Sequence, residues 1–269
     1  NQKIVEESPS VFITPELRKD MGEKAVAAAK AVNYIGAGTI EFLVDKHRNY
    51  YFLEMNTRLQ VEHPITEEVV GVDLVKEQIK VADNQVLKLK QEDIKQRGHA
   101  IECRICAEDT EMNFMPSPGV IKQITEPNGI GVRIDSYVYE GYEIPIYYDP
   151  MIGKLIVWAT TREYAIERMR RVLHEYKLTG VKNNISYLRC IMDTADFVEG
   201  HYDTGFIAKN GEALQKCITH TSERSEKIAM IAAYMDYLMN LEENSGSATD
   251  NRPISKWKEF GLHKGVLRI

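Results

Sequence analysis

The sequence predicts an α+β protein in which helices and antiparallel strands occupy separate stretches of the chain. Three observations lead to this prediction. Apolar residues recur at helical spacing over residues 15–32, two strand-like runs flank a polar loop over residues 39–57, and strand-like runs follow one another over residues 99–158. This grouping is typical of the α+β class.

Length and charge exclude several classes of protein. The 269 residues suffice for one large domain or two small ones, with a core that needs no disulfide or metal. A content of 43% hydrophobic and 28% charged residues is typical of a soluble globular protein. The net charge of −6 offers no basic excess, and the apolar runs fall well short of the roughly 20 residues of a membrane span. We therefore expect neither nucleic acid nor a membrane as a partner.

The four cysteines do not suggest a disulfide framework. Cys103 and Cys106 have C-x-x-C spacing, but their segment alternates like a strand, and residues three apart on a strand point to opposite faces. The sequence has no second Cys or His pair that would complete a zinc site. We therefore expect reduced cysteines and a cytoplasmic location.

The first predicted helix covers residues 15–32. Thr14 can cap it, and Pro15 suits its first position. Its apolar stripe, which we expect to be buried, consists of Leu17, Met21, Ala25, Ala28 and Val32. A second helix is predicted over residues 73–82.

A hairpin is predicted after the first helix, with strands over residues 39–45 and 50–57. If the turn is centred between His47 and Arg48, residues whose numbers sum to 95 lie opposite each other. Glu41 then faces Glu54. Beyond residue 99, strands dominate up to about residue 158, and Asn128-Gly129 is typical of a hairpin turn.

The last part of the chain is predicted to be mainly helical. Thr160 and Glu163 can form a capping box that opens a helix reaching about residue 178. Its apolar stripe consists of Ala165, Met169, Val172 and Tyr176. A further helix is expected over residues 222–241, with its methionines in core packing. The composition of residues 242–251 is typical of a linker.

The second hairpin strand carries an unusual polar face. A period of two places four polar side chains on one face, namely Glu54, Asn56, Arg58 and Gln60. The opposite face, which we expect to lie on the core, contains Leu53, Met55 and Leu59. Glu41 of the first strand points to the polar side as well.

Two carboxylates that face each other across a strand pair repel unless an ion compensates them. Glu41 and Glu54, with the amide oxygen of Asn56, offer the hard oxygen ligands that Mg²⁺ prefers. The alternative is a solvent-facing carboxylate pair that a lysine neutralises. The spacing favours the metal site but leaves both open.

These residues also resemble a known family. Phe52-Leu-Glu-Met-Asn-Thr-Arg-Leu59 resembles a signature of the ATP-grasp ligases that act on bicarbonate. Four further motifs resemble the biotin carboxylases in particular: Gln60-Val-Glu-His-Pro64, Glu102-Cys-Arg-Ile-Cys-Ala-Glu-Asp109, Pro116-Ser-Pro-Gly119 and Tyr147-Tyr-Asp-Pro-Met-Ile-Gly-Lys154. The motifs agree in order and spacing, and the resemblance extends from residue 1 to about residue 210.

The resemblance implies three segments. Residues 1–85 would be the C-terminal part of an ATP-grasp domain, and residues 86–210 the biotin carboxylase C-terminal domain, an antiparallel sheet with packed helices. Residues 211–269 would form a helical extension, a linker and a tail. The family's glycine-rich phosphate loop and N-terminal domain have no counterpart in this sequence, so we expect a C-terminal portion that does not turn over alone.

The resemblance also implies roles for the hairpin residues. Glu41 and Glu54 would contact ATP and, together with Asn56, hold Mg²⁺ on its phosphates. Lys3 matches a lysine that contacts bicarbonate.

The residues after the hairpin would act on bicarbonate itself. Arg58 would bind this planar anion with its planar guanidinium. Gln60 and the backbone of Val61 would contribute to the same site. Glu62 matches the general base that deprotonates bicarbonate.

Arg104 matches an arginine that stabilises the enolate of biotin and takes part in biotin binding. Without the resemblance, its position on one strand face with Glu102 and Glu108 would favour an ion-paired surface arginine. Asp149 and Lys154 leave two alternatives open, a buried ion pair or an interface contact.

The implied reaction is a two-step carboxylation of biotin on a carrier protein. Bicarbonate attacks ATP to give carboxyphosphate and ADP, carboxyphosphate breaks down to CO₂ and phosphate, and N1′ of biotin captures the CO₂. The implied cofactors are ATP, Mg²⁺ or Mn²⁺, and biotin as a carrier-bound substrate. The implied partners are a biotin carboxyl carrier protein, a second copy of the chain and a carboxyltransferase, within an acetyl- or propionyl-CoA carboxylase of fatty acid metabolism.

Two other functions stay open. One is another bicarbonate-using ATP-grasp ligase, such as a carbamoyl-phosphate synthetase, although the motifs at 102–109 and 147–151 resemble only the biotin enzymes. The other is a non-catalytic dimerisation module built on the same fold.

Overall fold

The computed structural model describes residues 3–245. The chain divides into two compact units, Asn1–Ile218 and Thr219–Ile269. Most of the predicted linker and the whole tail lie outside the described residues. None of the helices within the described range is long and apolar enough to cross a membrane.

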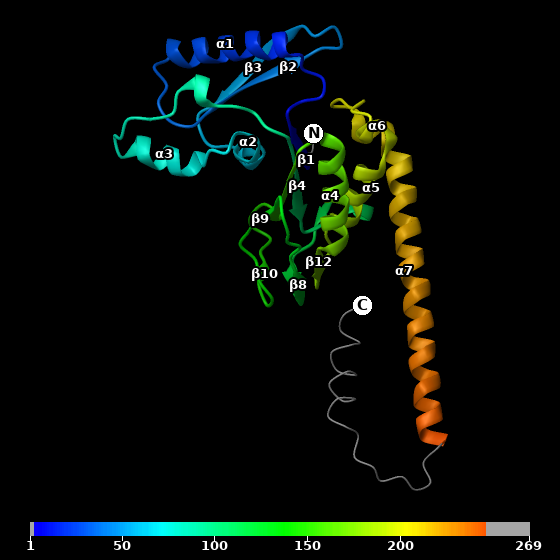
Figure 1. Cartoon of the computed structure of the whole chain (residues 1–269). Helices are drawn as coiled ribbons and strands as arrows, with labels where there is room; N and C mark the ends of the chain where they lie inside the picture. Colours follow the sequence, from blue (N-terminus) through cyan, green and yellow to red (C-terminus); the bar gives the residue numbers. More distant parts are fainter. Residues whose placement is uncertain (1–2, 246–269) are drawn as a thin grey trace. The chain divides into compact units, whose positions relative to one another are not determined.

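A four-stranded antiparallel sheet forms the centre of the first unit (Figure 1). Its strands, in spatial order, are β1 (Val5–Ser8), β4 (His99–Cys106), β11 (Met151–Ala159) and β9 (Val132–Ser136). The two inner strands, β4 and β11, are buried along most of their length. The antiparallel sheet with packed helices that the sequence predicts is thus confirmed.

Helices α4 (Arg162–Glu175) and α5 (Ile185–Asp193) cover one face of this sheet (Figure 1). Alternate residues of β4, such as Ile101 and Ile105, point to this side and are fully buried in one cluster with the helices. Burial of apolar side chains at about 25 cal/mol per Å² makes this cluster the main source of stability in the unit.

Helix α2 (His63–Val70) covers the opposite face. Its Ile65 and Val69 pack against Ala100 of β4, with Trp158 of β11 beside them. Because side chains alternate along β4, this face also carries Glu102 and Arg104. The site predicted from the sequence therefore lies on the α2 side of the sheet.

An N-terminal layer consists of α1 (Pro15–Ala31) and the hairpin of β2 (Thr39–Val44) and β3 (Tyr50–Asn56). The predicted cap is confirmed, since Thr14 accepts a hydrogen bond of 3.3 Å from the backbone N–H of Leu17. The predicted buried stripe is wrong, because α1 has no buried residue and Val32 is 63% exposed. An open pocket of about 980 Å³ separates α1 from the hairpin.

The remaining described elements are short. They are α3 (Leu74–Ala82), α6 (Ala195–Val198), the 3₁₀ turns Gln91–Asp93 and Thr110–Met112, and three strand pairs, β5 (Glu108–Asp109) with β6 (Met115–Pro116), β7 (Gly119–Val120) with β10 (Glu143–Ile144), and β8 (Gln123–Thr125) with β12 (Lys177–Thr179). The hairpin predicted at Asn128-Gly129 is wrong, because the strands before and after it belong to different sheets.

Helix α4 begins one residue later than predicted. Thr161, not Thr160, is its cap and accepts from the N–H of Tyr164 at 3.3 Å. The helix ends at Glu175 because the chain becomes extended and pairs as β12 with β8. Ala165, Met169 and Val172 are buried as predicted.

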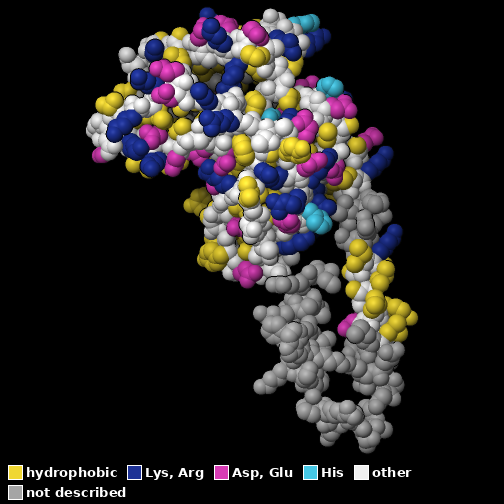
Figure 2. Space-filling view, viewed as in Figure 1, with side chains coloured by type: hydrophobic (Ala, Val, Ile, Leu, Met, Phe, Trp, Pro, Cys, Tyr) yellow, Lys and Arg dark blue, Asp and Glu magenta, His cyan; other side chains and the backbone are white. Residues whose placement is uncertain are grey.

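Helix α7 (Phe206–Ser245) is longer than the predicted helix at both ends. Its first residues pack on the core of the first unit, where Leu214 and Ile218 are buried. Further along, several hydrophobic side chains are exposed (Figure 2), including Met230 and Met235, which the sequence placed in core packing.

The expectation of four reduced cysteines is wrong. Cys190 of α5 and Cys217 of α7 form a disulfide with a Cα–Cα distance of 6.1 Å. Sequence spacing could not show this pair, because the fold of two helices brings together cysteines that are 27 residues apart. Cys103 and Cys106 are free and buried, and burial raises the pKa of the Cys106 thiol to about 12.

Candidate active site

The hairpin places Glu41 directly opposite Glu54, as predicted. Thr39, Ile40 and Glu41 follow the predicted sum of 95, but Phe42 pairs with Phe52, so the register shifts by one. The shift leaves Leu53 as an extra residue, 51% exposed, which corrects the expectation that it faces the core. A bulge of this kind re-aims the residues beyond it.

Four polar side chains gather at the end of this hairpin around Glu41. Oε1 of Glu41 accepts hydrogen bonds from Nδ2 of Asn56 at 2.9 Å and from Nε2 of Gln60 at 2.6 Å. Nδ2 of Asn56 also donates to Oε1 of Glu54 at 3.1 Å. Nζ of Lys3 lies 3.6 Å from Oε2 of Glu41. We call Lys3, Glu41, Glu54, Asn56 and Gln60 the carboxylate cluster.

The carboxylate cluster fits a hard divalent cation in its chemistry. Its Glu41, Glu54 and Asn56 supply two carboxylates and one amide oxygen, and water or phosphate oxygens would complete an octahedral shell around Mg²⁺. Within residues 3–245, no group of three or more His, Cys, Asp or Glu side chains is placed to hold a metal by itself. The lysine alternative is also visible, because Lys3 forms an ion pair with Glu41.

Strand β3 ends at Asn56, so Arg58 and Gln60 do not share its face as predicted. The chain leaves the sheet there to enter α2, whose second residue is Pro64. Gln60 still turns back to Glu41, whereas Arg58 is exposed and donates to the carbonyl of Leu59 at 3.2 Å. We call residues 57–62 the bicarbonate turn, after their predicted role.

Arg104 connects β4 to the bicarbonate turn. Its Nη2 donates to Oε2 of Glu62 at 2.9 Å and lies 2.5 Å from Oε1 of Glu6. The arginine side chain is only 17% exposed, so the surface alternative is wrong, although the residue is ion-paired. Its partners are not the neighbouring Glu102 and Glu108. The predicted base and the predicted biotin-binding arginine are thus in direct contact across 42 residues of sequence.

Two buried carboxyl groups behind Arg104 were missed by sequence reasoning. Glu6 of β1 pairs with Glu102 of β4, and neither oxygen of Glu102 has a hydrogen-bond partner among the described residues. Burial, with the charge of Glu6 added, raises the pKa of Glu102 to about 8. Burial likewise raises the pKa of Glu6 to about 7, although Arg104 opposes the shift. Only the pairing of β1 with β4 brings these residues together, and no local pattern encodes it.

For Lys154, the structure decides between the two alternatives that the sequence left open, a buried ion pair and an interface contact. Its ammonium lies 3.3 Å from Oδ2 of Asp135 and donates to the carbonyl of Val61 at 3.1 Å. Asp149 instead accepts from the N–H of Met151 at 2.8 Å. The lysine is therefore in a buried ion pair, but with a partner on β9.

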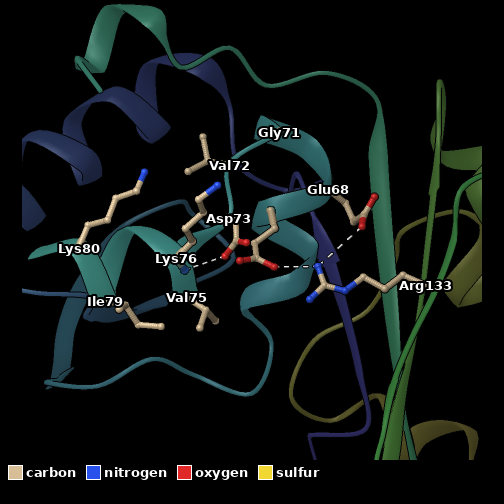
Figure 3. A pocket seen from close by; sticks show the side chains of 10 residues that line it. Glu68, Gly71, Val72, Asp73, Val75, Lys76, Ile79, Lys80 and Arg133 are labelled. Carbon is tan, nitrogen blue, oxygen red and sulfur yellow. Dashed lines mark hydrogen bonds and ion pairs between the residues drawn. The ribbon is translucent and has the colours of Figure 1, made fainter. Parts of the chain in front are cut away.

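A separate open pocket of about 930 Å³ lies beside α2 and α3 (Figure 3). Val72, Val75 and Ile79 line it together with Lys76 and Lys80, and Arg133 reaches it from β9. It contains none of the residues that the sequence predicts for the site. The predicted residues instead form the carboxylate cluster and the Glu62–Arg104 contact.

Comparisons with known proteins find two family models along the chain. Residues 1–90 match the domain described as carbamoyl-phosphate synthase L chain, ATP binding domain, and residues 102–209 match the biotin carboxylase C-terminal domain. The chain is 55% identical over 214 residues to the chloroplastic biotin carboxylase of Arabidopsis thaliana, a match that covers 80% of this chain and 40% of that protein. It is 54% identical over 207 residues to biotin carboxylase 1 of Bacillus subtilis, covering 77% of this chain and 46% of that protein.

Solved structures give the same result. The biotin carboxylase domain dimer of Hydrogenobacter thermophilus 2-oxoglutarate carboxylase, in complex with MgADP, ADP and bicarbonate, superposes with a TM-score of 0.78 at 47% identity. The match covers 80% of this chain and 47% of that one. The chain thus consists of an ATP-grasp-type segment followed by a biotin carboxylase C-terminal domain.

The chain belongs to the biotin carboxylase family. It spans less than half the length of these curated relatives.

Proposed function

We propose that the chain forms part of a biotin carboxylase, an ATP-dependent ligase that carboxylates biotin on a carrier protein. The observation that carries this proposal is the contact between Arg104 of the sheet and Glu62, the last residue of the bicarbonate turn. The relative from Hydrogenobacter thermophilus binds MgADP and bicarbonate, which supports ATP and bicarbonate as substrates here.

In this proposal Glu62 removes the proton of bicarbonate. A general base must lie within hydrogen-bond reach of the proton that it takes, and the hydrogen bond from Arg104 holds the carboxylate of Glu62 at the bicarbonate turn. Arg58 is exposed and holds the planar anion, while Gln60 fixes the end of the turn against Glu41. The Val61 backbone completes the bicarbonate site.

Glu41, Glu54 and Asn56 would hold Mg²⁺, and Lys3 would add positive charge beside them. Bound Mg²⁺ would neutralise charge on the ATP phosphates. Asn56 now donates its amide N–H groups to both carboxylates, so its carbonyl oxygen must turn toward the cation when the ion binds.

Arg104 would change partners during the cycle. Paired with Glu62 it holds the side chain of the base in place, and once bicarbonate has given up its proton to Glu62 the guanidinium is released toward the ureido oxygen of biotin. Charge-assisted hydrogen bonds from arginine would stabilise the biotin enolate that captures CO₂.

The proposal includes partners and boundaries. We assign residues 1–85 to the ATP-grasp domain, 86–210 to the C-terminal domain and 211–269 to an extension, and we expect the fragment to be inactive alone. A carrier protein, a second copy of the chain and a carboxyltransferase would complete an acyl-CoA carboxylase, such as an acetyl- or propionyl-CoA enzyme. The dimer of the Hydrogenobacter relative supports the second copy.

Bicarbonate-dependent ATP hydrolysis by the complete polypeptide, measured with and without free biotin, tests the proposed function. We expect biotin to stimulate hydrolysis and carboxybiotin to accumulate. Hydrolysis that biotin leaves unchanged would contradict the carboxylase assignment, and carbamoyl phosphate as the product would indicate the other class of ATP-grasp ligase.

A further inference from the structure

Three cationic side chains from neighbouring strands face the segment that joins the hairpin to α2. They are Arg104 of β4, Lys154 of β11 and Arg133 of β9. In the strand register Lys154 lies opposite Arg104 on one side and opposite Asp135 on the other. Side chains of directly opposed residues share a face of the sheet, so Lys154 lies between Arg104 and Asp135. Arg133, two residues before Asp135 on β9, is on the same face.

Each cation contacts a different point of residues 61–67. Nη2 of Arg104 donates to the carboxylate of Glu62 at 2.9 Å, and Nζ of Lys154 donates to the carbonyl of Val61 at 3.1 Å. Nη1 of Arg133 donates to Oε2 of Glu67 at 2.7 Å, and Figure 3 shows this arginine reaching toward α2. The sheet therefore holds the end of the bicarbonate turn and the start of α2 at three points.

The contact of Lys154 with the carbonyl of Val61 follows from the burial and the charge of the lysine. The lysine side chain is only 12% exposed, so its charge must be compensated inside the protein. Asp135 supplies the counter-charge at 3.3 Å. Burial of Asp135 raises its pKa, but the hydrogen bonds and charges of Arg133 and Lys154 together outweigh burial and lower the pKa of this carboxyl. Arg133 also donates to both oxygens of Asp135, at 2.8 and 2.9 Å. The ammonium of Lys154 has three N–H donors, so it can contact Asp135 and the turn at the same time.

The carbonyl of Val61 and the N–H of Glu62 belong to one planar peptide unit. A hydrogen bond that fixes the carbonyl also fixes the plane of this unit, and with it the direction in which Glu62 leaves the backbone. The N–H of Val61, the backbone donor that could face bicarbonate, belongs to the preceding peptide unit, which shares the Cα of Val61 with the held unit. One ammonium group thus constrains two parts of the bicarbonate site without touching bicarbonate.

We propose that Lys154 is a positioning residue of the carboxylation reaction, which holds the Val61–Glu62 peptide so that the turn and the base face bicarbonate together. This inference rests on the proposed function. It assigns to Lys154 no contact with ATP, bicarbonate or biotin.

The test uses Lys154→Met and Lys154→Arg in the complete carboxylase. Methionine keeps much of the apolar stem and removes the donors, so kcat/KM for bicarbonate should fall about tenfold or more while KM for ATP stays within about twofold. Arginine should recover part of the loss. Lys177→Met is the matched control, because Lys177 also donates to a backbone carbonyl, that of His174 at 3.0 Å, but is exposed.

Hydrogen exchange on this chain gives a readout that does not depend on activity. Lys154→Met should lose protection at the amides of residues 60–65 and keep it along β4 and β11. Protection lost along the strands too, or unchanged kinetic constants for bicarbonate in an active enzyme, would overturn the proposal. A wild-type enzyme that biotin does not stimulate would instead refute the proposed function, and the exchange result would still decide whether Lys154 holds the turn.

Discussion

Side chains are much more deeply buried in the central sheet than in the N-terminal layer of the first unit. In the sheet, Ile101 and Leu155 are fully buried between strands and helices. In the layer, α1 has no buried residue, and Tyr51 and Phe52 of β3 are 58% and 61% exposed. The predicted site includes residues of both, because Arg104 lies on the sheet whereas Glu41, Glu54 and Asn56 lie on the hairpin.

This difference in burial implies that the sheet is rigid and that the hairpin layer can change conformation more easily. Regions with few buried apolar contacts open at low free energy, whereas a close-packed core opens only with global unfolding. We infer that the sheet fixes the base and its arginine, and that the hairpin can shift as ligands arrive at the carboxylate cluster.

The sharpest test of this contrast compares two leucines. Leu155→Ala should lower the free energy of unfolding by about 2–5 kcal/mol, because it leaves a cavity in a fully buried site. Leu53→Ala, at a half-exposed bulge, should cost less than about 1 kcal/mol. Urea denaturation of the chain measures both, and equal losses would contradict the contrast.

The disulfide should stabilise the well-packed part of the first unit, because it joins α5, which packs on the sheet, to α7. Cys190 and Cys217 are 27 residues apart in sequence, and the loop-entropy relation for a loop of this length gives about 3.5 kcal/mol. Cys217→Ser should lower the melting temperature, and dithiothreitol should have the same effect on the wild type but none on the variant. A melting temperature that dithiothreitol does not change would show that this bond does not stabilise the fold.

Glu102 makes the stability of the sheet depend on pH. Burial raises its pKa to about 8, so the native carboxyl keeps its proton up to that pH, whereas in the unfolded chain it loses the proton near pH 4.5. Between these values the native state binds more protons than the unfolded state. The contribution of Glu102 to stability therefore falls as pH rises from about 4.5, and the fall is complete above about pH 8.

Glu102→Gln should therefore gain stability relative to the wild type between about pH 5 and pH 9, as measured by melting temperature. Glu23→Gln, at an exposed position of α1, is the control and should show a constant difference. Parallel pH curves for wild type and Glu102→Gln would show that Glu102 is ionised in the native state.

The smallest expected effect belongs to the hairpin. Mg²⁺ at about tenfold excess over its dissociation constant should stabilise the chain by about 1.4 kcal/mol through the carboxylate cluster. Glu41→Gln should abolish this gain and, without Mg²⁺, should change stability by only a few tenths of a kcal/mol, because it relieves repulsion from Glu54 but weakens the contact with Lys3. Equal responses of wild type and variant to Mg²⁺ and to EDTA would place the ion elsewhere.

Local patterns predicted some of the local structure but not the burial of α1 or the end of β3. Hairpin turn and alternation were enough to place Glu41 opposite Glu54, and the cap at Thr14 follows from its hydroxyl. The bulge at Leu53 could not be predicted, because it depends on how the turn at residues 45–49 closes. Long-range pairing was equally hidden, so Glu6, the disulfide and the partner of Lys154 emerged only from the fold.

The central claim is that Glu62 is the base and that Arg104 holds it in place. The direct measurement is bicarbonate-dependent ATP hydrolysis by the complete carboxylase carrying Glu62→Gln, with ATP affinity measured separately and the exposed Glu92→Gln as control. We predict that turnover falls by about 10²-fold or more while ATP affinity changes less than about twofold. Turnover near that of the wild type would show that Glu62 is not the base and would contradict the account.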